Sequence, residues 1–239
     1  MSYRVREIFS TLQGEGSRAG SLSVFVRFAG CNLWNGRPED REKGKGACAL
    51  WCDTDFVKGK EVSAEDVRLE LDRLWGERLP SAKWCVLSGG EPLLQVDHAL
   101  VDELQRHGWN VAIETNGTLD NRALDLMDHV CVSPKLGSTI ERMRADELKV
   151  VLPGHVDFEK GWTDGRLVDL QESGEWGALY IQPQDPIYTD EVNASYLASK
   201  VRTGGRDLYE RNLNRCLNFV ANHPEWRLSL QVHKYARIP

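Results

Sequence analysis

The chain has 239 residues, of which 41% are hydrophobic and 28% are charged, and its formal net charge is −6. This composition is typical of a globular protein, and no apolar run is long enough to cross a membrane. The acidic balance disfavours a chain-wide contact with nucleic acid, and the first residues lack the pattern of a secretory signal. We therefore expect one cytoplasmic domain over residues 1–239 that contacts neither membrane nor nucleic acid directly.

Short apolar runs alternate with amphipathic segments along the chain. The apolar runs predict buried strands at residues 24–28, 84–87, 111–114, 130–133, 148–152, 179–182 and 228–231. The segments between them predict helices that begin after Ser63 and after Asp97, a shorter one at about 121–127, and a longer helical region at about 192–220 with an interruption at Gly204-Gly205. This order predicts an α/β fold with right-handed crossovers and one mainly parallel sheet, either open or partly closed into a barrel.

Polar motifs follow several predicted strands at the point where each strand ends. They are Gly30-Cys31, Ser88-Gly89-Gly90-Glu91, Glu114, Ser133-Pro134-Lys135 and Gln182. The carboxyl ends of parallel strands share one edge of the sheet, and active sites of such folds lie there. We therefore expect these motifs to form one site.

Three of the six cysteines, Cys31, Cys48 and Cys52, fall in one polar loop. Three thiolates can hold three irons of an iron–sulfur cubane, and because such clusters usually take four cysteines, the fourth iron would be open to another ligand. A structural zinc site is the alternative, but zinc usually takes four Cys or His ligands and the loop has no histidine. The other cysteines lie in strand-like or helical segments, where we expect them to pack in the core: Cys85, Cys131 and Cys216.

The loop contains Gly30-Cys31-Asn32-Leu33 and, after Cys48, the segment Trp51-Cys52-Asp53-Thr54. These segments resemble the cluster loop of the radical S-adenosylmethionine (SAM) superfamily. The spacing departs from the usual Cys-x3-Cys-x2-Cys, because 16 residues separate Cys31 from Cys48 and three separate Cys48 from Cys52. The resemblance implies an incomplete TIM-like β/α barrel, a single radical SAM domain, with a 4Fe–4S cluster held by Cys31, Cys48 and Cys52 in a loop at about residues 30–56.

The segment Ser88-Gly89-Gly90-Glu91 resembles the superfamily's Gly-Gly-Glu motif, which binds the amino group of SAM. Two glycines allow the backbone to approach a ligand closely, and a carboxylate accepts hydrogen bonds from an ammonium group. On the residues alone, an ordinary β–α turn is the alternative. The resemblance implies a SAM site formed by Ser88, Gly89, Gly90, Glu91, Ser133, Lys135 and Gln182.

The N-terminal segment Leu12-Gln13-Gly14-Glu15-Gly16 indicates which family within the superfamily the chain resembles. Gln13 and Glu15 lie two residues apart, so in an extended strand their side chains point the same way and could together bind the guanidine-like edge of a pterin. On the residues alone, polar contacts between strands are the alternative. This segment, the long insert after Cys31 and the C-terminal His-Lys-Tyr stretch resemble the 7-carboxy-7-deazaguanine synthases. That resemblance implies Mg²⁺ at Thr54 and a substrate site formed by Leu12, Gln13, Glu15, Arg27, Ser88, Glu114, His233 and Pro239.

Members of that family convert 6-carboxy-5,6,7,8-tetrahydropterin to 7-carboxy-7-deazaguanine and release ammonia, in queuosine biosynthesis. The resemblance therefore implies a homodimeric radical SAM lyase that uses SAM, a 4Fe–4S cluster, Mg²⁺ and a flavodoxin-like or ferredoxin-like electron donor. No side chain is assigned as catalytic, because SAM supplies the radical. Two alternatives stay open: a radical SAM activase that acts on a partner protein, and a non-enzymatic metal-binding or electron-transfer module.

Overall fold

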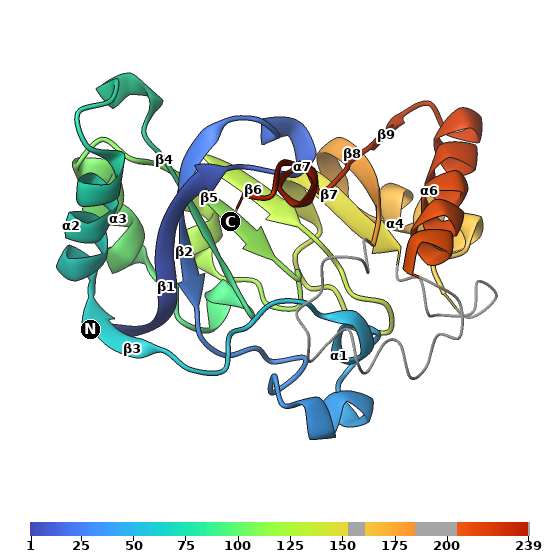
Figure 1. The fold of residues 1–239 in the computed structure, drawn as a ribbon, viewed down its shortest axis with the longest axis horizontal. Helices are drawn as coiled ribbons and strands as arrows, with labels where there is room; N and C mark the ends of the chain where they lie inside the picture. The colour runs from blue at the N-terminus through green and yellow to red at the C-terminus, as the bar shows by residue number, and fades with distance from the viewer. Residues whose placement is uncertain (153–160, 185–204, 239) are drawn as a thin grey trace.

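The computed structural model describes residues 1–152, 161–184 and 205–238, and within them the strands form one sheet in the order β3-β1-β2-β4-β5-β6-β7-β8-β9 (Figure 1). The N-terminal part is antiparallel and consists of β1 (Ser2–Leu12), β2 (Leu22–Phe28) and β3 (Lys60–Ser63). From β2 onward all neighbours are parallel: β4 (Trp84–Gly89), β5 (Asn110–Thr115), β6 (His129–Val132), β7 (Arg144–Leu152), β8 (Glu175–Pro183) and β9 (Trp226–Leu228). The sheet is not closed, because β3 and β9 are its two edges, and the prediction of an incomplete, mainly parallel α/β barrel is confirmed.

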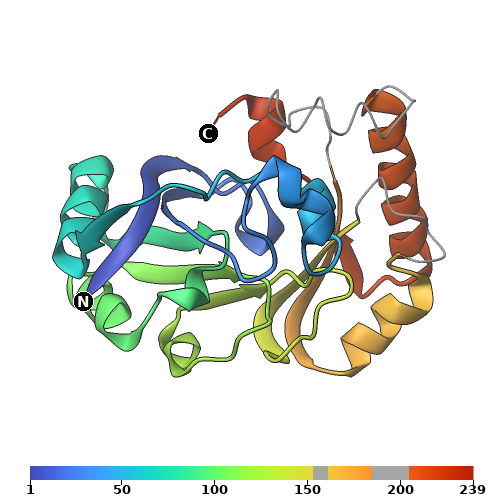
Figure 2. The same ribbon diagram turned by 90° about the horizontal axis from the view of Figure 1, so that it is seen from below.

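The helices gather at the two ends of the sheet, and Figure 2 shows the same separation as Figure 1. At one end lie α2 (Ala64–Trp75) and α3 (His98–Arg106), and at the other lie α4 (Asp164–Glu172) and α6 (Gly205–Asn222). Two short helices, α1 (Cys48–Trp51) and α7 (Val232–Ala236), belong to the cysteine loop and to the C-terminal tail. Short 3₁₀ turns cover Gly16–Arg18, Pro38–Lys43, Pro80–Ala82, Pro92–Leu94 and Arg122–Leu126. Among the described residues no helix combines the length and the apolarity needed to cross a membrane.

Local sequence signals explain where α2 and α3 begin. Ser63 accepts a hydrogen bond from the Asp66 amide while the Asp66 carboxylate accepts one from the Ser63 amide, which is a capping box that satisfies two N-terminal donors. Asp97 caps α3 through the Leu100 amide. Both helices bury one apolar face, and Trp75 at the end of α2 packs edge to face on another buried tryptophan, Trp109, at a ring distance of 5.7 Å.

Most predicted strands lie within observed ones, but two expectations fail and a third is tested only in part. The strand expected at 228–231 is wrong in position: β9 ends at Leu228, because the chain turns there toward the tail. The helix expected at 121–127 is only a 3₁₀ turn over Arg122–Leu126, because the Asn121 side chain caps the Ala123 amide and the backbone is already extended again at Met127. The helical region expected at 192–220 begins, where described, at Gly205, and residues 192–204 lie outside the described part of the chain.

The sequence analysis missed β1, β3 and α4. In β1 the buried residues Tyr3 and Val5 alternate with exposed ones. The alternation then stops, because Arg6 and Glu7 are both exposed, and so the strand shows no continuous period of two. Cys85, Cys131 and Cys216 are free and buried, so the prediction that they pack in the core is confirmed.

The loop between β1 and β2 reaches across to the segment that follows β9. The Gly14 carbonyl oxygen accepts a hydrogen bond from the Val232 amide at 3.0 Å, and the Gly16 amide donates to the Ser229 hydroxyl at 3.0 Å. These contacts join the two ends of the chain beside the carboxyl edge of the sheet. They bring the N-terminal motif and the tail into one place.

Candidate active site

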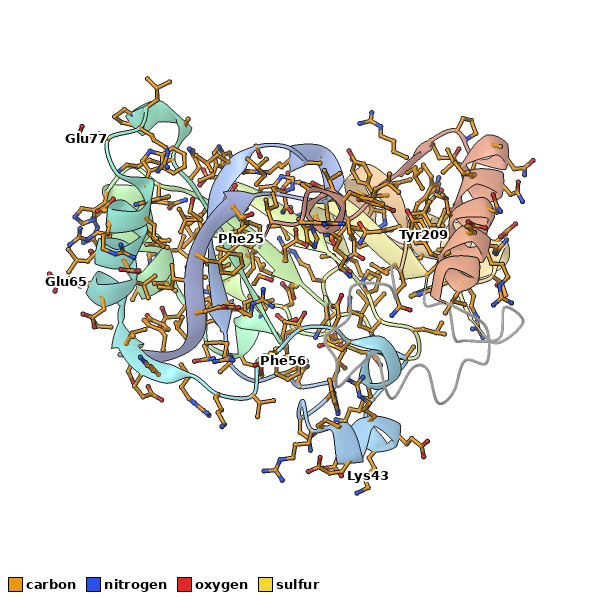
Figure 3. The ribbon with its side chains drawn as sticks, viewed as in Figure 1. Phe25, Lys43, Phe56, Glu65, Glu77 and Tyr209 are labelled. Atoms are coloured by element: carbon orange, nitrogen blue, oxygen red, sulfur yellow. The ribbon has the colours of Figure 1, made fainter. Side chains whose placement is uncertain are left out.

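A cavity of about 640 Å³ lies at the carboxyl ends of the parallel strands. Figure 3 labels two residues of its lining, Phe25 on β2 and Phe56 after α1. Nearly all the residues predicted for the site line this cavity: Leu12, Gln13, Glu15, Arg27, Cys31, Cys48, Cys52, Thr54, Ser88, Gly89, Gly90, Glu114, Ser133, Lys135, Gln182 and His233. Two predicted residues do not appear in the lining: Glu91 is completely buried, and Pro239 lies outside the described residues.

Three thiols form one part of the lining, which we call the thiol side: Cys31, Cys48 and Cys52. Cys48 is the first residue of α1 and Cys52 follows its last, so the three-residue gap places both sulfurs on one face of a single helical turn. The Cys52 thiol donates a hydrogen bond to Cys48, which lowers the pKa of Cys48 and raises that of Cys52 well above its ordinary value. Within the described residues, no three Cys, His, Asp or Glu side chains converge on a point that one metal ion could occupy. A cubane places each thiolate on a different iron, so its ligands need not converge in that way.

Aromatic side chains pack behind the thiols. Trp34 and Phe56 are 6% and 1% exposed and meet edge to face with 5.9 Å between ring centroids, in an apolar cluster that includes Cys31 and Cys52. Burial raises the pKa of Cys31, although its sulfur accepts a hydrogen bond from the Leu33 amide at 3.4 Å. The thiol side is therefore shielded from water on its inner face.

Two glycines at the end of β4, Gly89 and Gly90, pack against the backbone that leads from β2 into the cysteine loop. A Cβ atom on Gly90 would be 2.1 Å from the Gly30 carbonyl oxygen and 2.8 Å from the Cys31 Cβ. Gly89 has a φ of +140°, and a Cβ there would be 2.3 Å from the Phe28 carbonyl oxygen. Only glycine allows this close approach, so these two residues position Cys31.

Glu91 lies behind this turn and is 0% exposed. Its carboxylate accepts hydrogen bonds from the Leu93 amide at 3.0 Å, the Thr115 hydroxyl at 2.8 Å and the Asn116 amide at 2.7 Å. Burial raises the pKa of Glu91, while these donors oppose the rise. Glu91 thus connects the turn after β4 to the end of β5, and a direct contact with a ligand's amino group stays a prediction.

A second part of the lining consists of carboxylate, amide and ammonium groups instead of thiols. We call it the carboxylate side: Gln13, Glu15, Glu114, Lys149 and Gln231. The Lys149 ammonium donates to Glu15 Oε2 at 2.6 Å and to Glu114 Oε2 at 2.8 Å. The Gln13 amide donates to Glu114 Oε1 at 3.1 Å, and the Gln231 amide donates to Glu15 Oε1 at 3.0 Å. Every carboxylate oxygen of this group therefore has a donor before any ligand binds.

The charges of the carboxylate side stabilise one another. Burial alone would raise the pKa of Glu15, but the Lys149 ammonium outweighs it and lowers that pKa to about 2. Burial alone would lower the pKa of Lys149, whereas the carboxylates of Glu114 and Glu15 raise it well above its ordinary value. The Glu15 carboxylate and the Lys149 ammonium are accordingly ionised at neutral pH.

The remaining predicted residues surround these two sides. Arg27 pairs with Glu7 at 2.9 Å and lies over the Phe9 ring, 5.4 Å from its centroid. The Lys135 ammonium donates to the Ser133 hydroxyl at 3.0 Å, and the buried Gln182 side chain accepts from the Ser229 hydroxyl at 2.7 Å.

The tail closes the cavity from the side of the cysteine loop. Lys234 on α7 donates to Asp53 at 2.8 Å, and Asp53 lies between Cys52 and Thr54. His233 packs against Gly14, where a Cβ atom would be 2.0 Å from its Nδ1, and burial lowers its pKa. The tail therefore contacts both the cysteine loop and the N-terminal motif.

Comparison with known proteins decides the family. No family model matches the chain. Full-length relatives do: the 7-carboxy-7-deazaguanine synthase of Burkholderia multivorans is 40% identical over 247 residues, 100% of both chains, and that of Bradyrhizobium diazoefficiens is 40% identical over 240 residues, 98% of both chains. The chain belongs to the 7-carboxy-7-deazaguanine synthase family. A further member, from Caulobacter vibrioides, is 38% identical over 245 residues and 100% of both chains.

The fold comparison agrees. The crystal structure of QueE from Escherichia coli has a TM-score of 0.69 with this chain at 24% identity and covers 98% of this chain and 95% of its own. Because the relatives of this synthase family match over their full length, the chain is an enzyme, and the non-enzymatic alternative is set aside.

Sequence reasoning missed two residues of the carboxylate side, Lys149 and Gln231. One signal was available: Lys149 is a charged residue inside the apolar run of β7, where a buried parallel strand is expected to be apolar. No local pattern marks Gln231, because its role depends on the tail folding back onto the β1–β2 loop.

Proposed function

We propose that residues 1–239 form a single radical SAM domain that converts 6-carboxy-5,6,7,8-tetrahydropterin to 7-carboxy-7-deazaguanine with release of ammonia, using a 4Fe–4S cluster, SAM and Mg²⁺. The observation that carries the proposal is the meeting of the thiol side and the carboxylate side in one cavity. Family membership supports the same product. We expect the enzyme to act in the cytoplasm as a homodimer, with a flavodoxin-like or ferredoxin-like electron donor.

The residues present fit the proposed cofactors. Cys31, Cys48 and Cys52 supply three sulfur donors for the cluster, and Gly89 and Gly90, which line the same cavity, let the end of β4 pack against the backbone beside Cys31. Ser88, Glu91, Ser133, Lys135 and Gln182 would hold SAM. When bound, the cluster and SAM supply the carbon radical that removes a hydrogen atom from the substrate.

The chain's own part is to bind and orient the pterin. The carboxylates of Glu15 and Glu114 would accept hydrogen bonds from the N–H groups of its guanidine-like edge, with Gln13 beside them. Arg27 would pair with the substrate carboxylate, because a guanidinium matches a carboxylate with two parallel hydrogen bonds. Leu12, Ser88, His233 and Pro239 would complete the substrate site.

Magnesium fits next to Thr54. A hydroxyl is a hard oxygen ligand that needs further oxygens from water or substrate, and the half-buried Thr54 lines the cavity beside Asp53, whose charge Lys234 balances. The metal there would orient the substrate and stabilise negative charge.

The test is an anaerobic assay of reconstituted enzyme with SAM, dithionite, Mg²⁺ and the tetrahydropterin, followed by mass spectrometry. We expect 7-carboxy-7-deazaguanine with little net loss of SAM. If only 5′-deoxyadenosine accumulates, the radical SAM chemistry holds and the proposed substrate is wrong. If an intact cluster gives neither product, the proposal fails.

Two substitutions test the residues that are proposed to bind the substrate. Glu15→Ala and Arg27→Ala should abolish turnover, because each removes a charged partner of the substrate, while the visible absorption of the cluster stays intact. Loss of the cluster in either variant would instead assign that residue a structural role.

A further inference from the structure

Lys149 is the least exposed charged side chain of the carboxylate side. Its side chain is 3% exposed, against 17% for Glu15 and 21% for Glu114. The two carboxylates come from different parts of the chain, the β1–β2 loop and β5, and both lie within 2.8 Å of the same nitrogen. One ammonium therefore joins the two carboxylates directly.

Two carboxylates this close, in a buried site, do not stay ionised without a cation. Like charges in a shared site raise one pKa strongly, and the pair then holds one proton between its oxygens. A protonated carboxyl group donates a hydrogen bond through that oxygen. It can no longer accept from a ring N–H group at the same position.

From this geometry we propose that Lys149 is a positioning residue that keeps Glu15 and Glu114 ionised together and fixes where their free lone pairs point. Both carboxylates can then accept the N–H donors of one guanidine-like ring edge. The inference rests on the proposed function, since the ring it concerns is the pterin of that reaction. Lys149 acts through the two glutamates and takes no part in bond breaking.

The other groups around the lysine do not replace its charge. Burial holds the pKa of Cys131 well above its ordinary value, so at neutral pH it is an uncharged thiol. Burial also lowers the pKa of His233, which keeps that imidazole neutral. The titratable groups that face Lys149 from the neighbouring elements are Glu15, Glu114, Cys131, Glu147 and His233. Asp53 also faces Glu15, and Arg18 faces Glu114, but the Arg18 guanidinium lies over the Trp84 ring and donates to Ser23. Lys149 is thus the cation that both Glu15 and Glu114 contact.

The experiment compares Lys149→Gln with wild type over a pH series, in enzyme loaded with cluster, SAM and Mg²⁺. Two quantities are measured: the affinity for 6-carboxypterin, by quenching of its fluorescence, and KM for the tetrahydropterin. Wild-type affinity should change little between about pH 5.5 and about pH 7.5, because Lys149 keeps both carboxylates ionised over this range. Lys149→Gln should bind about 10- to 100-fold more weakly at the acidic end, and the deficit should shrink several-fold toward the upper end as the shared proton dissociates.

Two further variants make the result specific. Lys149→Arg keeps the charge and should retain the flat pH profile, even if its larger head lowers the affinity. Lys83→Gln removes the lysine of a different ion pair, with Asp72 at 3.0 Å outside the cavity, and should leave pterin affinity unchanged at every pH.

Each outcome distinguishes the two proposals. If wild type neither binds nor converts the pterin, the proposed function fails and this inference fails with it. If wild type does both and Lys149→Gln shows either no loss or a loss that is the same at every pH, only the role of Lys149 is overturned. If Lys149→Gln does not fold, the role of Lys149 is tested on the other proteins. A pterin affinity that falls at acidic pH in wild type or in Lys149→Arg would overturn that role equally.

Discussion

The two sides of the cavity are built in opposite ways. The carboxylate side rests on strands and on the turns directly attached to them, and its ions are paired with one another at 2.6 and 2.8 Å. The thiol side rests on a loop with a single helical turn, and Cys48 and Cys52 are hydrogen bonded mainly to each other. Thiols are weak hydrogen-bond partners but strong ligands for iron.

This difference indicates that the positions of the side chains on the two sides of the cavity are fixed by different interactions. On the carboxylate side the protein itself supplies the compensating charges, so the geometry for a polar ring is set by the fold. On the thiol side the order depends on backbone packing, above all on the Gly30–Gly90 contact, and the proposed cluster would add to it. Changes on the first side should therefore alter substrate affinity, and changes on the second should alter cluster content.

The largest expected effect is on the thiol side. Cys48→Ser should remove the cluster, measured as iron and sulfide per chain, and turnover should become undetectable because a hydroxyl is a poor ligand for iron. Cys216→Ala is the matched control: that cysteine is buried at α6, away from the cavity, and its loss should cost about 1 kcal/mol of stability without loss of iron. Full iron content in Cys48→Ser would contradict the assignment.

The contrast between the two sides also explains what the sequence could predict. Cys48 and Cys52 carry a short-range pattern, and the predicted parallel strands brought the five strand-end motifs to one edge, as the structure confirms. The carboxylate side is formed by residues as far apart as Glu15 and Gln231, which meet only because the tail crosses the β1–β2 loop. That crossing depends on tertiary contacts, so no periodicity or spacing predicts Gln231 as a member of the site, whereas Lys149 is marked only as a charge inside an apolar strand.

A smaller effect is expected from Gly90→Ala. The added Cβ would lie 2.1 Å from the Gly30 carbonyl oxygen, which is backbone and cannot rotate away, so Cys31 or the end of β4 must move. A displacement of about 1 Å costs about 100-fold in rate, so SAM cleavage should slow by that order. Gly165→Ala on α4 is the control, because a Cβ there meets nothing and should raise stability by about 0.5 kcal/mol. Equal SAM cleavage in both variants would show that the glycine contact is dispensable.

A third prediction concerns the connection between the two sides. Lys234→Met removes the ion pair with Asp53 that joins α7 to the cysteine loop. We expect KM for the pterin to rise about tenfold with unchanged iron content, since α7 also carries His233 over the substrate site. Lys83→Met breaks a comparable pair with Asp72 outside the cavity and should alter stability alone. A loss of iron in Lys234→Met would show that the tail holds the cysteine loop together instead.

The smallest effect should come from a neutral donor of the carboxylate side. Gln231→Ala removes the amide that donates to Glu15 Oε1 at 3.0 Å, while Lys149 still holds Oε2 at 2.6 Å. One hydrogen bond of this kind is worth about 0.5–1.5 kcal/mol, so KM should rise about two- to tenfold with kcat nearly unchanged. The same substitution at Gln171, which accepts from the Trp226 indole at 2.7 Å outside the cavity, should lower the melting temperature and leave KM alone. If Gln231→Ala raised KM as much as Lys149→Gln does, the hydrogen bonds rather than the buried charge would set the geometry of the carboxylate side.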